Sequence, residues 1–93
     1  MSANPLSGKR YHIIGRMKSK PSIMARMEIA GAIYRAKLSS LTDILVIPDD
    51  VEAQNQSLTQ TLTIALEMEK KGKLKILSEN QIEEVLSYEE KNH

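Results

Sequence analysis

The sequence predicts a small α/β sandwich whose elements follow the order β-α-β-β-α-β-α. Short apolar segments of strand type alternate with longer segments whose apolar residues recur at helical spacing. One run, I-L-V-I at Ile44–Ile47, is apolar throughout, as in a strand that is buried on both faces. Two Ser-x-x-Gln capping boxes mark helix starts, and helices between strands favour parallel neighbours with right-handed crossovers.

Four segments have the composition of strands. They are Lys9–Ile14, Ile33–Leu38, Ile44–Ile47 and Lys73–Leu77. The first is β-branched toward its end and stops at Gly15, and the third stops at Pro48. The second and fourth alternate between apolar and basic residues, which predicts one solvated face, with Leu74 and Ile76 pointing inward.

Three segments have helical spacing. They are Pro21–Ala30, Ser57–Lys71 and a last helix that starts after Ser78. Pro21 suits a first helical turn, and Gly31 is placed to end that helix in the left-handed conformation. Ser57 and Ser78 are each followed three residues later by Gln, which predicts reciprocal caps at both helix starts.

The composition is that of one ordinary globular domain. The chain has 93 residues, of which 41% are hydrophobic and 27% charged, and it can bury one modest core. It has no cysteine, which excludes disulfides and cysteine-ligated zinc and fits a reducing compartment. No apolar run reaches the roughly 18–20 residues of a membrane span, and the start is unlike a signal peptide. We expect a soluble, cytoplasmic protein without membrane contact.

The net charge of +1 hides a sorting of charge along the chain. Residues 1–47 hold eight Lys and Arg against two Asp and Glu, a net charge of +6. Residues 48–93 hold five bases against ten acids, a net charge of −5. If the first half forms one surface, that surface attracts phosphates, although charge sorting can also simply pair the two halves of a fold.

The inventory of catalytic residues is thin, so we expect no enzymatic activity in this domain. His12 lies inside a strand and His93 is the last residue, so no pair of histidines has metal-ligand spacing. The Asp49-Asp50 turn lacks the glycine and the spaced oxygens of a calcium loop. No serine has a nucleophile elbow, and no glycine spacing cradles a nucleotide. We expect neither a metal nor a cofactor.

The strongest candidate site is the basic loop that leads into the first helix. Gly15 opens this loop, and Arg16, Lys18 and Lys20 follow beside the free N–H groups at the helix start. This arrangement is typical of a phosphate site. The alternative is that these basic residues are only solvated, since a cation at a helix start is slightly unfavourable.

Two blocks of sequence resemble the BRCT family, most closely the C-terminal domain of bacterial NAD-dependent DNA ligases. They are G-K-R-Y-H-I-I-G at Gly8–Gly15 and G-A-I-Y-R-A-K-L-S-S-L-T-D-I-L-V at Gly31–Val46. The resemblance implies a three-layer sandwich around a four-stranded parallel sheet of strand order 2-1-3-4. We expect residues 1–7 to form a flexible lead-in, residues 8–88 the domain and residues 89–93 a polar tail.

The resemblance also implies a phosphate pocket, from which this sequence departs. Family members use a Ser or Thr hydroxyl, the N–H of the glycine after it, and a Lys at the second helix. The matching positions here are Ile14, Gly15 and a site near Thr61 without a Lys, so only the Gly15 N–H is kept. Ile82 replaces the large aromatic residue of the last helix.

We therefore carry two hypotheses of function. The first is a non-catalytic module of a replication or repair protein that binds DNA backbone or 5′-phosphate ends without sequence specificity. Its contact residues are Gly15, Arg16, Lys18, Lys20, Lys9 and Arg10, with Arg26 and Lys37 as further candidates. The alternative is a protein-interaction or self-association module without DNA contact, with exposed Met17, Met24 or Met68 as its apolar contacts.

Overall fold

The computed structural model describes residues 6–50 and 56–91, the side chains of residues 56–59 excepted. The elements are β1 (Arg10–Ile13), α1 (Lys20–Ile29), β2 (Ile33–Tyr34), β3 (Ile44–Ile47), α2 (Gln56–Lys70), β4 (Lys75–Ser78) and α3 (Glu79–Lys91). All pairings are parallel, and the strand order is β2-β1-β3-β4. The predicted fold class, element order and strand order are confirmed.

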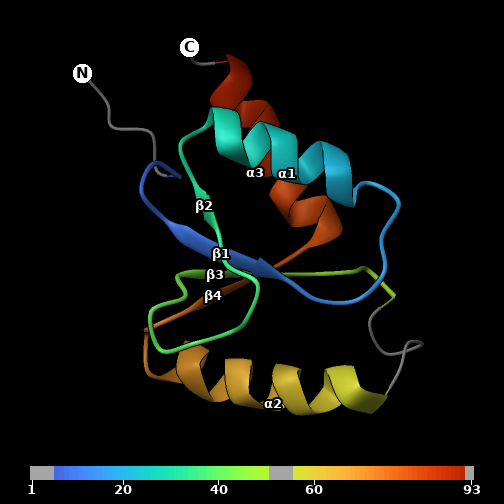
Figure 1. Cartoon of the computed structure of the whole chain (residues 1–93), viewed down its shortest axis with the longest axis vertical. Coiled ribbons are helices and arrows are strands. Elements are labelled where there is room, and N and C mark those ends of the chain that lie inside the picture. Colours follow the sequence, from blue (N-terminus) through green and yellow to red (C-terminus); the bar gives the residue numbers. More distant parts are fainter. Residues whose placement is uncertain (1–5, 51–55, 92–93) are drawn as a thin grey trace.

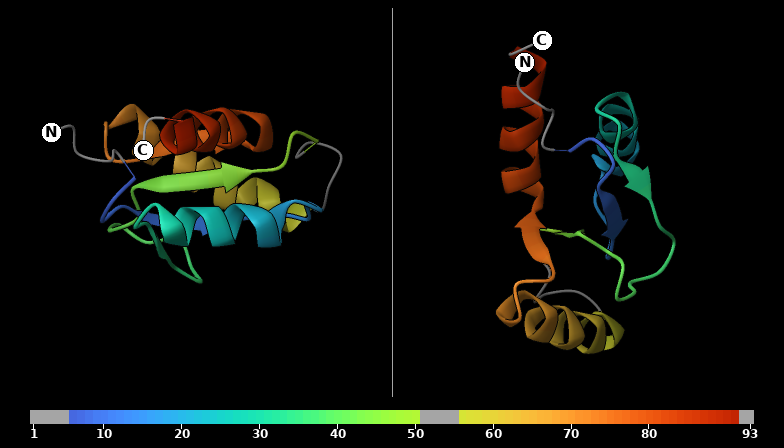
Figure 2. Two further views of the ribbon diagram at one scale, coloured as in Figure 1. Left: turned by 90° about the horizontal axis from the view of Figure 1, so that it is seen from above. Right: turned by 90° about the vertical axis from the view of Figure 1, so that its left-hand side faces the viewer.

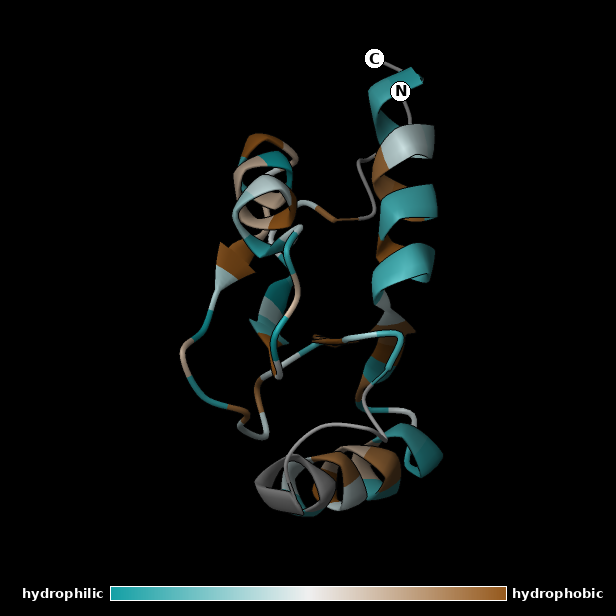
Figure 3. Cartoon of the chain, turned by 90° about the vertical axis from the view of Figure 1, so that its right-hand side faces the viewer, coloured by the Kyte–Doolittle hydropathy of each residue, from teal (hydrophilic) through white to brown (hydrophobic). Residues whose placement is uncertain are grey.

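The sheet is the middle layer of three. α1 and α3 cover one face and α2 covers the other (Figures 1 and 2). The larger core cluster lies under α1 and α3, where Tyr11, Ile23, Met27, Val46 and Ile82 are buried. The smaller cluster lies under α2. In Figure 3 the apolar residues of α3 recur between polar turns, as expected for a helix with one buried side.

β3 is buried on both faces, as its apolar composition predicts. Val46 belongs to the cluster under α1 and α3, whereas Leu45 belongs to the cluster under α2. Both side chains are fully buried. β1 and β4 pair with the two edges of β3, in the registers Tyr11↔Ile44 and Ile44↔Lys75. β3 therefore sets the position of every other element.

The second strand is much shorter than expected, since β2 is Ile33–Tyr34 and does not extend to Leu38. The N–H of Arg35 donates to the carbonyl of Tyr11 at 2.7 Å, which continues the ladder by one bond. The carbonyl of Arg35 then accepts a hydrogen bond from Nδ1 of His12 at 2.8 Å. In a longer β2, the carbonyl of Arg35 would accept a hydrogen bond from an N–H of β1. Because it accepts from the His12 ring instead, the chain leaves the sheet at this residue.

The helix ends follow the expected chemistry, with small shifts of register. Gly31 has a φ of 90° and ends α1, as predicted, and a Cβ at this position would lie only 3.1 Å from Oγ of Ser7. At the start of α3, Oγ of Ser78 accepts from the N–H of Gln81 at 3.2 Å, and Oε1 of Gln81 accepts from the N–H of Ser78 at 2.8 Å. This capping box is confirmed. The cap expected at Ser57 lies outside the described side chains.

The structure describes residues on both sides of the boundaries expected at residues 8 and 88. Leu6 is buried in the larger cluster, so the core begins before Gly8. α3 continues to Lys91, and Glu89 on its inner side is buried. Leu6 and Glu89 both line a cavity at the amino end of the sheet, so the two ends of the described chain meet there.

Removal of the α3 cap should cost a measurable part of the stability. We expect Ser78→Ala to lower the free energy of unfolding by about 1 kcal/mol, because the N–H of Gln81 loses its acceptor. Urea denaturation measures this loss. Ser87→Ala is the matched control, because Ser87 is exposed within the same helix. Equal losses in the two variants would contradict the capping role.

Arg26 of α1 forms ion pairs with two glutamates of α3, and these ion pairs predict that the stability of the fold depends on pH. Nη1 of Arg26 lies 2.5 Å from Glu83, while Nε and Nη2 donate to the two carboxylate oxygens of Glu90 at 2.9 and 2.8 Å. The hydrogen bonds from Arg26 lower the pKa of Glu90. The pair therefore stabilises the fold above the ordinary glutamate pKa and loses its effect as the pH falls through the lowered value.

We expect Arg26→Gln to lower the melting temperature at neutral pH by a few degrees. The difference from the unmodified chain should shrink as the pH drops below about 4, where glutamates take up protons. Thermal melts across that pH range measure it. Lys70→Gln, which breaks an exposed pair with Glu67 at 3.7 Å, is the control with little expected effect. A difference that stays constant down to the lowest pH would refute the role of the ion pair.

Candidate nucleic-acid interface

The basic loop between β1 and α1 is a turn that leads directly into the start of the helix. Gly15 turns the chain out of the sheet with a φ of 78°. A turn then follows, in which the N–H of Lys20 donates to the carbonyl of Met17 at 3.2 Å, and α1 begins at Lys20. Arg16 and Lys18 are exposed, whereas Lys20 is half-buried. Among the described residues, neither Lys18 nor Lys20 forms an ion pair.

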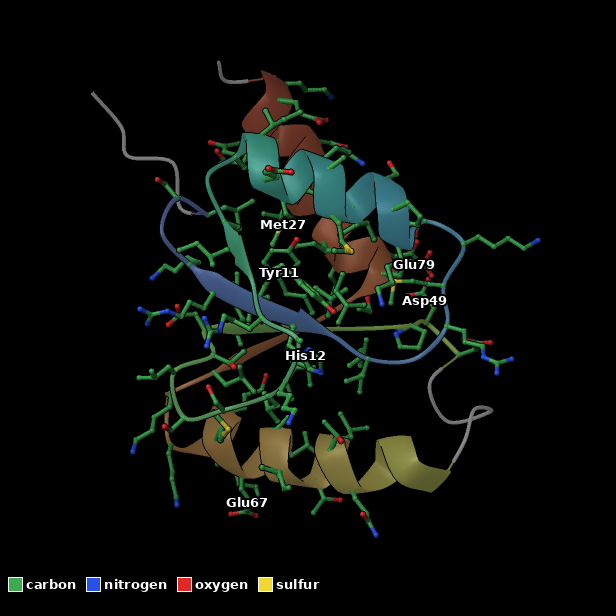
Figure 4. The ribbon with its side chains drawn as sticks, viewed as in Figure 1. Tyr11, His12, Met27, Asp49, Glu67 and Glu79 are labelled. Atoms are coloured by element: carbon green, nitrogen blue, oxygen red, sulfur yellow. The ribbon has the colours of Figure 1, made fainter. Side chains whose placement is uncertain are left out.

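Acidic residues lie next to this loop, although they are far from it in the sequence. The turn after β3 and the start of α3 reach the same edge of the parallel sheet, and Figure 4 shows Asp49 and Glu79 close together there. A hollow of about 680 Å³ is lined by Arg16, Met17, Lys18, Asp49, Asp50 and Glu79. Ser19 Oγ donates a hydrogen bond to Glu79, and the N–H of Asn80 donates to Asp49. The site is therefore of mixed charge.

The six predicted contact residues do not form one surface. Gly15, Arg16, Lys18 and Lys20 lie at the carboxyl end of β1, whereas Lys9 and Arg10 lie at its amino end. The five residue steps from Arg10 to Gly15 separate the two groups by roughly 16 Å. Arg26 is held by Glu83 and Glu90, so it is no free cation for DNA, and Lys37 lies in the exposed segment after β2.

The strand order 2-1-3-4 with helices on both faces, and the position of the glycine loops, point to one family. A family model described as the BRCA1 C Terminus (BRCT) domain matches residues 1–86. The chain belongs to the BRCT family. BRCT domains are generally non-catalytic modules that mediate protein interactions in DNA repair and the cell cycle. No curated protein matches the chain at a significant level.

The phosphate pocket that the family resemblance implies lacks two of its three groups in this chain. Ile14 takes the place of the hydroxyl residue, and its side chain is buried with Leu45 and Ala65 under α2. Its N–H is also engaged, because it donates to the carbonyl of Val46 at 3.1 Å. Thr61 on α2 brings no charge. Of the three phosphate-binding groups, the Gly15 N–H alone has its counterpart here.

The methionines expected as exposed contacts are packed instead. Met17 and Met24 lie against the cluster under α1 and α3, and Met68 lies against the cluster under α2. The exposed apolar residues are elsewhere. Those at the end of α1 and on β2 are Ile29, Ile33 and Tyr34, of which Ile29 is 86% exposed. The alternation expected over Ile33–Leu38 does not identify them, because β2 ends at Tyr34 and both of its residues are exposed.

Within the described residues there is no sign of catalytic or metal chemistry. No group of three or more His, Asp or Glu is placed to hold a metal ion. His12 is committed to the carbonyl of Arg35. Tyr11 is buried against Tyr34, and this burial raises its pKa to about 12, which keeps the phenol neutral. No described helix is long and apolar enough to cross a membrane.

Proposed function

We propose that this BRCT domain is a non-catalytic module of a cytoplasmic DNA replication or repair protein, similar to the C-terminal domain of bacterial NAD-dependent ligases. In this proposal, the domain contacts the DNA backbone or a 5′-phosphate end without reading sequence. The observation that carries the proposal is the loop Gly15–Lys20, where bases and backbone N–H groups gather at the start of α1.

The mixed charge of the hollow limits the strength of this contact. Asp49, Asp50 and Glu79 reduce the local potential, and at most three bases face a phosphate there. Three phosphate contacts correspond to a slope of about −2.7 in a plot of log K against log salt. Binding by the isolated domain is therefore weak, sensitive to salt and independent of base sequence.

A charge reversal tests the proposal. We expect Arg16→Glu with Lys20→Glu to abolish binding to a labelled duplex with a recessed 5′-phosphorylated end, as measured by fluorescence anisotropy. Lys70→Glu with Lys91→Glu carries the same change of net charge on exposed residues of other elements and should leave most binding in place. An unphosphorylated duplex separates end recognition from backbone contact. Unchanged affinity in the first double variant would refute the loop as the DNA site.

One observation favours the second function, a protein-interaction module without DNA contact. Ile29, Ile33 and Tyr34 expose apolar side chains at the end of α1 and on the β2 edge of the sheet. Within residues 6–50 and 56–91, no other strand pairs with the outer edge of the two-residue β2. A duplex that fails to bind even at low salt would favour this function over the first.

A further inference from the structure

A second cavity lies at the amino end of the sheet, opposite the Gly15–Lys20 loop. It has a volume of about 710 Å³. The strand starts form one wall and the second half of α3 forms the other. Its main lining residues are Lys9, Lys73, Lys75, Val85, Tyr88 and the apolar floor residue Leu77. We call this cavity the amino-end cleft.

Sheet geometry places Lys9 and Lys75 on the same face of the sheet. Lys9 precedes Tyr11 by two residues, and Lys75 precedes Leu77 by two; both Tyr11 and Leu77 belong to the cluster under α1 and α3. Since side chains alternate along a strand, Lys9 and Lys75 point to that face. Lys73 lies in the turn before β4, and it lines both this cleft and another cavity on the α2 side of the sheet. The register Tyr11↔Ile44↔Lys75 then sets β1 and β4 on either side of β3.

The lysines of this cleft are available to a ligand. All three are exposed, and none forms an ion pair within the part of the chain that the structure describes. Three acids also line the cleft. Asp43 accepts the N–H of Arg10 at 2.9 Å, and Glu89 is buried, which leaves Glu84 as the exposed acid. The wall formed by the strand starts is therefore basic.

The floor of the cleft is apolar. Leu6, Ile44 and Leu77 are buried side chains that border it, and Val85 is half-buried on the α3 wall. A concave apolar floor with a few convergent charged groups is the usual form of a binding site. A nucleic-acid backbone offers charge but no apolar group for such a floor. An acidic peptide with apolar side chains offers both.

We propose that the amino-end cleft binds a short acidic peptide segment of a partner protein, whose apolar side chain enters the floor while its carboxylates meet Lys9, Lys73 and Lys75. This proposal goes beyond DNA contact and does not depend on it, since the Gly15–Lys20 loop lies at the other end of β1. The free edge of β4 is not the docking element. Its outward N–H groups are taken by Glu69 at Ile76 and by Gln81 at Ser78.

The test uses the whole chain and a labelled eight-residue peptide of alternating aspartate and leucine, with fluorescence anisotropy as readout. Two control peptides each change one feature. The second peptide alternates aspartate with serine and so lacks the apolar side chains, and the third alternates lysine with leucine and so reverses the charge. We expect the first peptide to bind, the second to bind several-fold more weakly and the third not to bind. Lys73→Glu with Lys75→Glu should weaken binding of the first peptide about tenfold, because each exposed ion pair contributes a factor of about 2–5.

Lys18→Glu is the matched control, because it changes one exposed lysine at the opposite end of the sheet. This variant should bind the DNA duplex more weakly and bind the aspartate–leucine peptide with unchanged affinity. The DNA proposal and the peptide proposal can therefore fail separately. Lys73→Gln with Lys75→Gln keeps the test valid if the doubly reversed variant does not melt cooperatively.

Several results would overturn the proposal. They are no binding of the aspartate–leucine peptide at millimolar concentration, equal binding of the aspartate–serine peptide, and equal losses in the Lys18 and Lys73/Lys75 variants. A single-stranded oligonucleotide could instead bind more tightly than the peptide and lose affinity when Lys73 and Lys75 are replaced. That result would make the cleft a nucleic-acid site.

Discussion

Leu45 and Val46 point to opposite faces of the sheet and are both fully buried, which makes β3 the strand that the rest of the structure depends on. A strand covered on both faces needs helices on both sides, and α2 supplies the second cover. Because β1 and β4 pair with β3 in parallel, the carboxyl ends of the strands lie at one edge of the sheet and their amino ends at the other. The positions of the charged loops follow from this single constraint.

The sorting of charge along the chain is therefore not preserved in space. The basic loop after β1 meets Asp49 and Glu79, which come from the acidic half of the sequence. At the other edge, Lys9 meets Lys73 and Lys75, although the latter two also belong to the acidic half. Each end of the sheet is thus a separate surface, one of mixed charge and one with a basic wall and an apolar floor.

The parts of the fold that could be predicted are those encoded by neighbouring residues. The apolar run of β3, the Ser78–Gln81 capping box and the left-handed Gly31 are local signals, and all three are confirmed. The length of β2 could not be predicted, because it depends on a hydrogen bond from His12 to Arg35 across the sheet. Likewise, linear charge counts do not place Asp49 beside the basic loop, whereas the parallel topology does.

The central claim is that the two ends of the sheet carry two independent binding surfaces. Nuclear magnetic resonance of the amide groups tests it most directly, with the phosphorylated duplex and the aspartate–leucine peptide titrated separately and then together. We expect the duplex to shift amides of Gly15–Lys20 and the peptide to shift those around Lys9, Lys73 and Tyr88, with each affinity unchanged by the other ligand. Shifts from both ligands at one shared set of amides, or competition between the two, would contradict the claim.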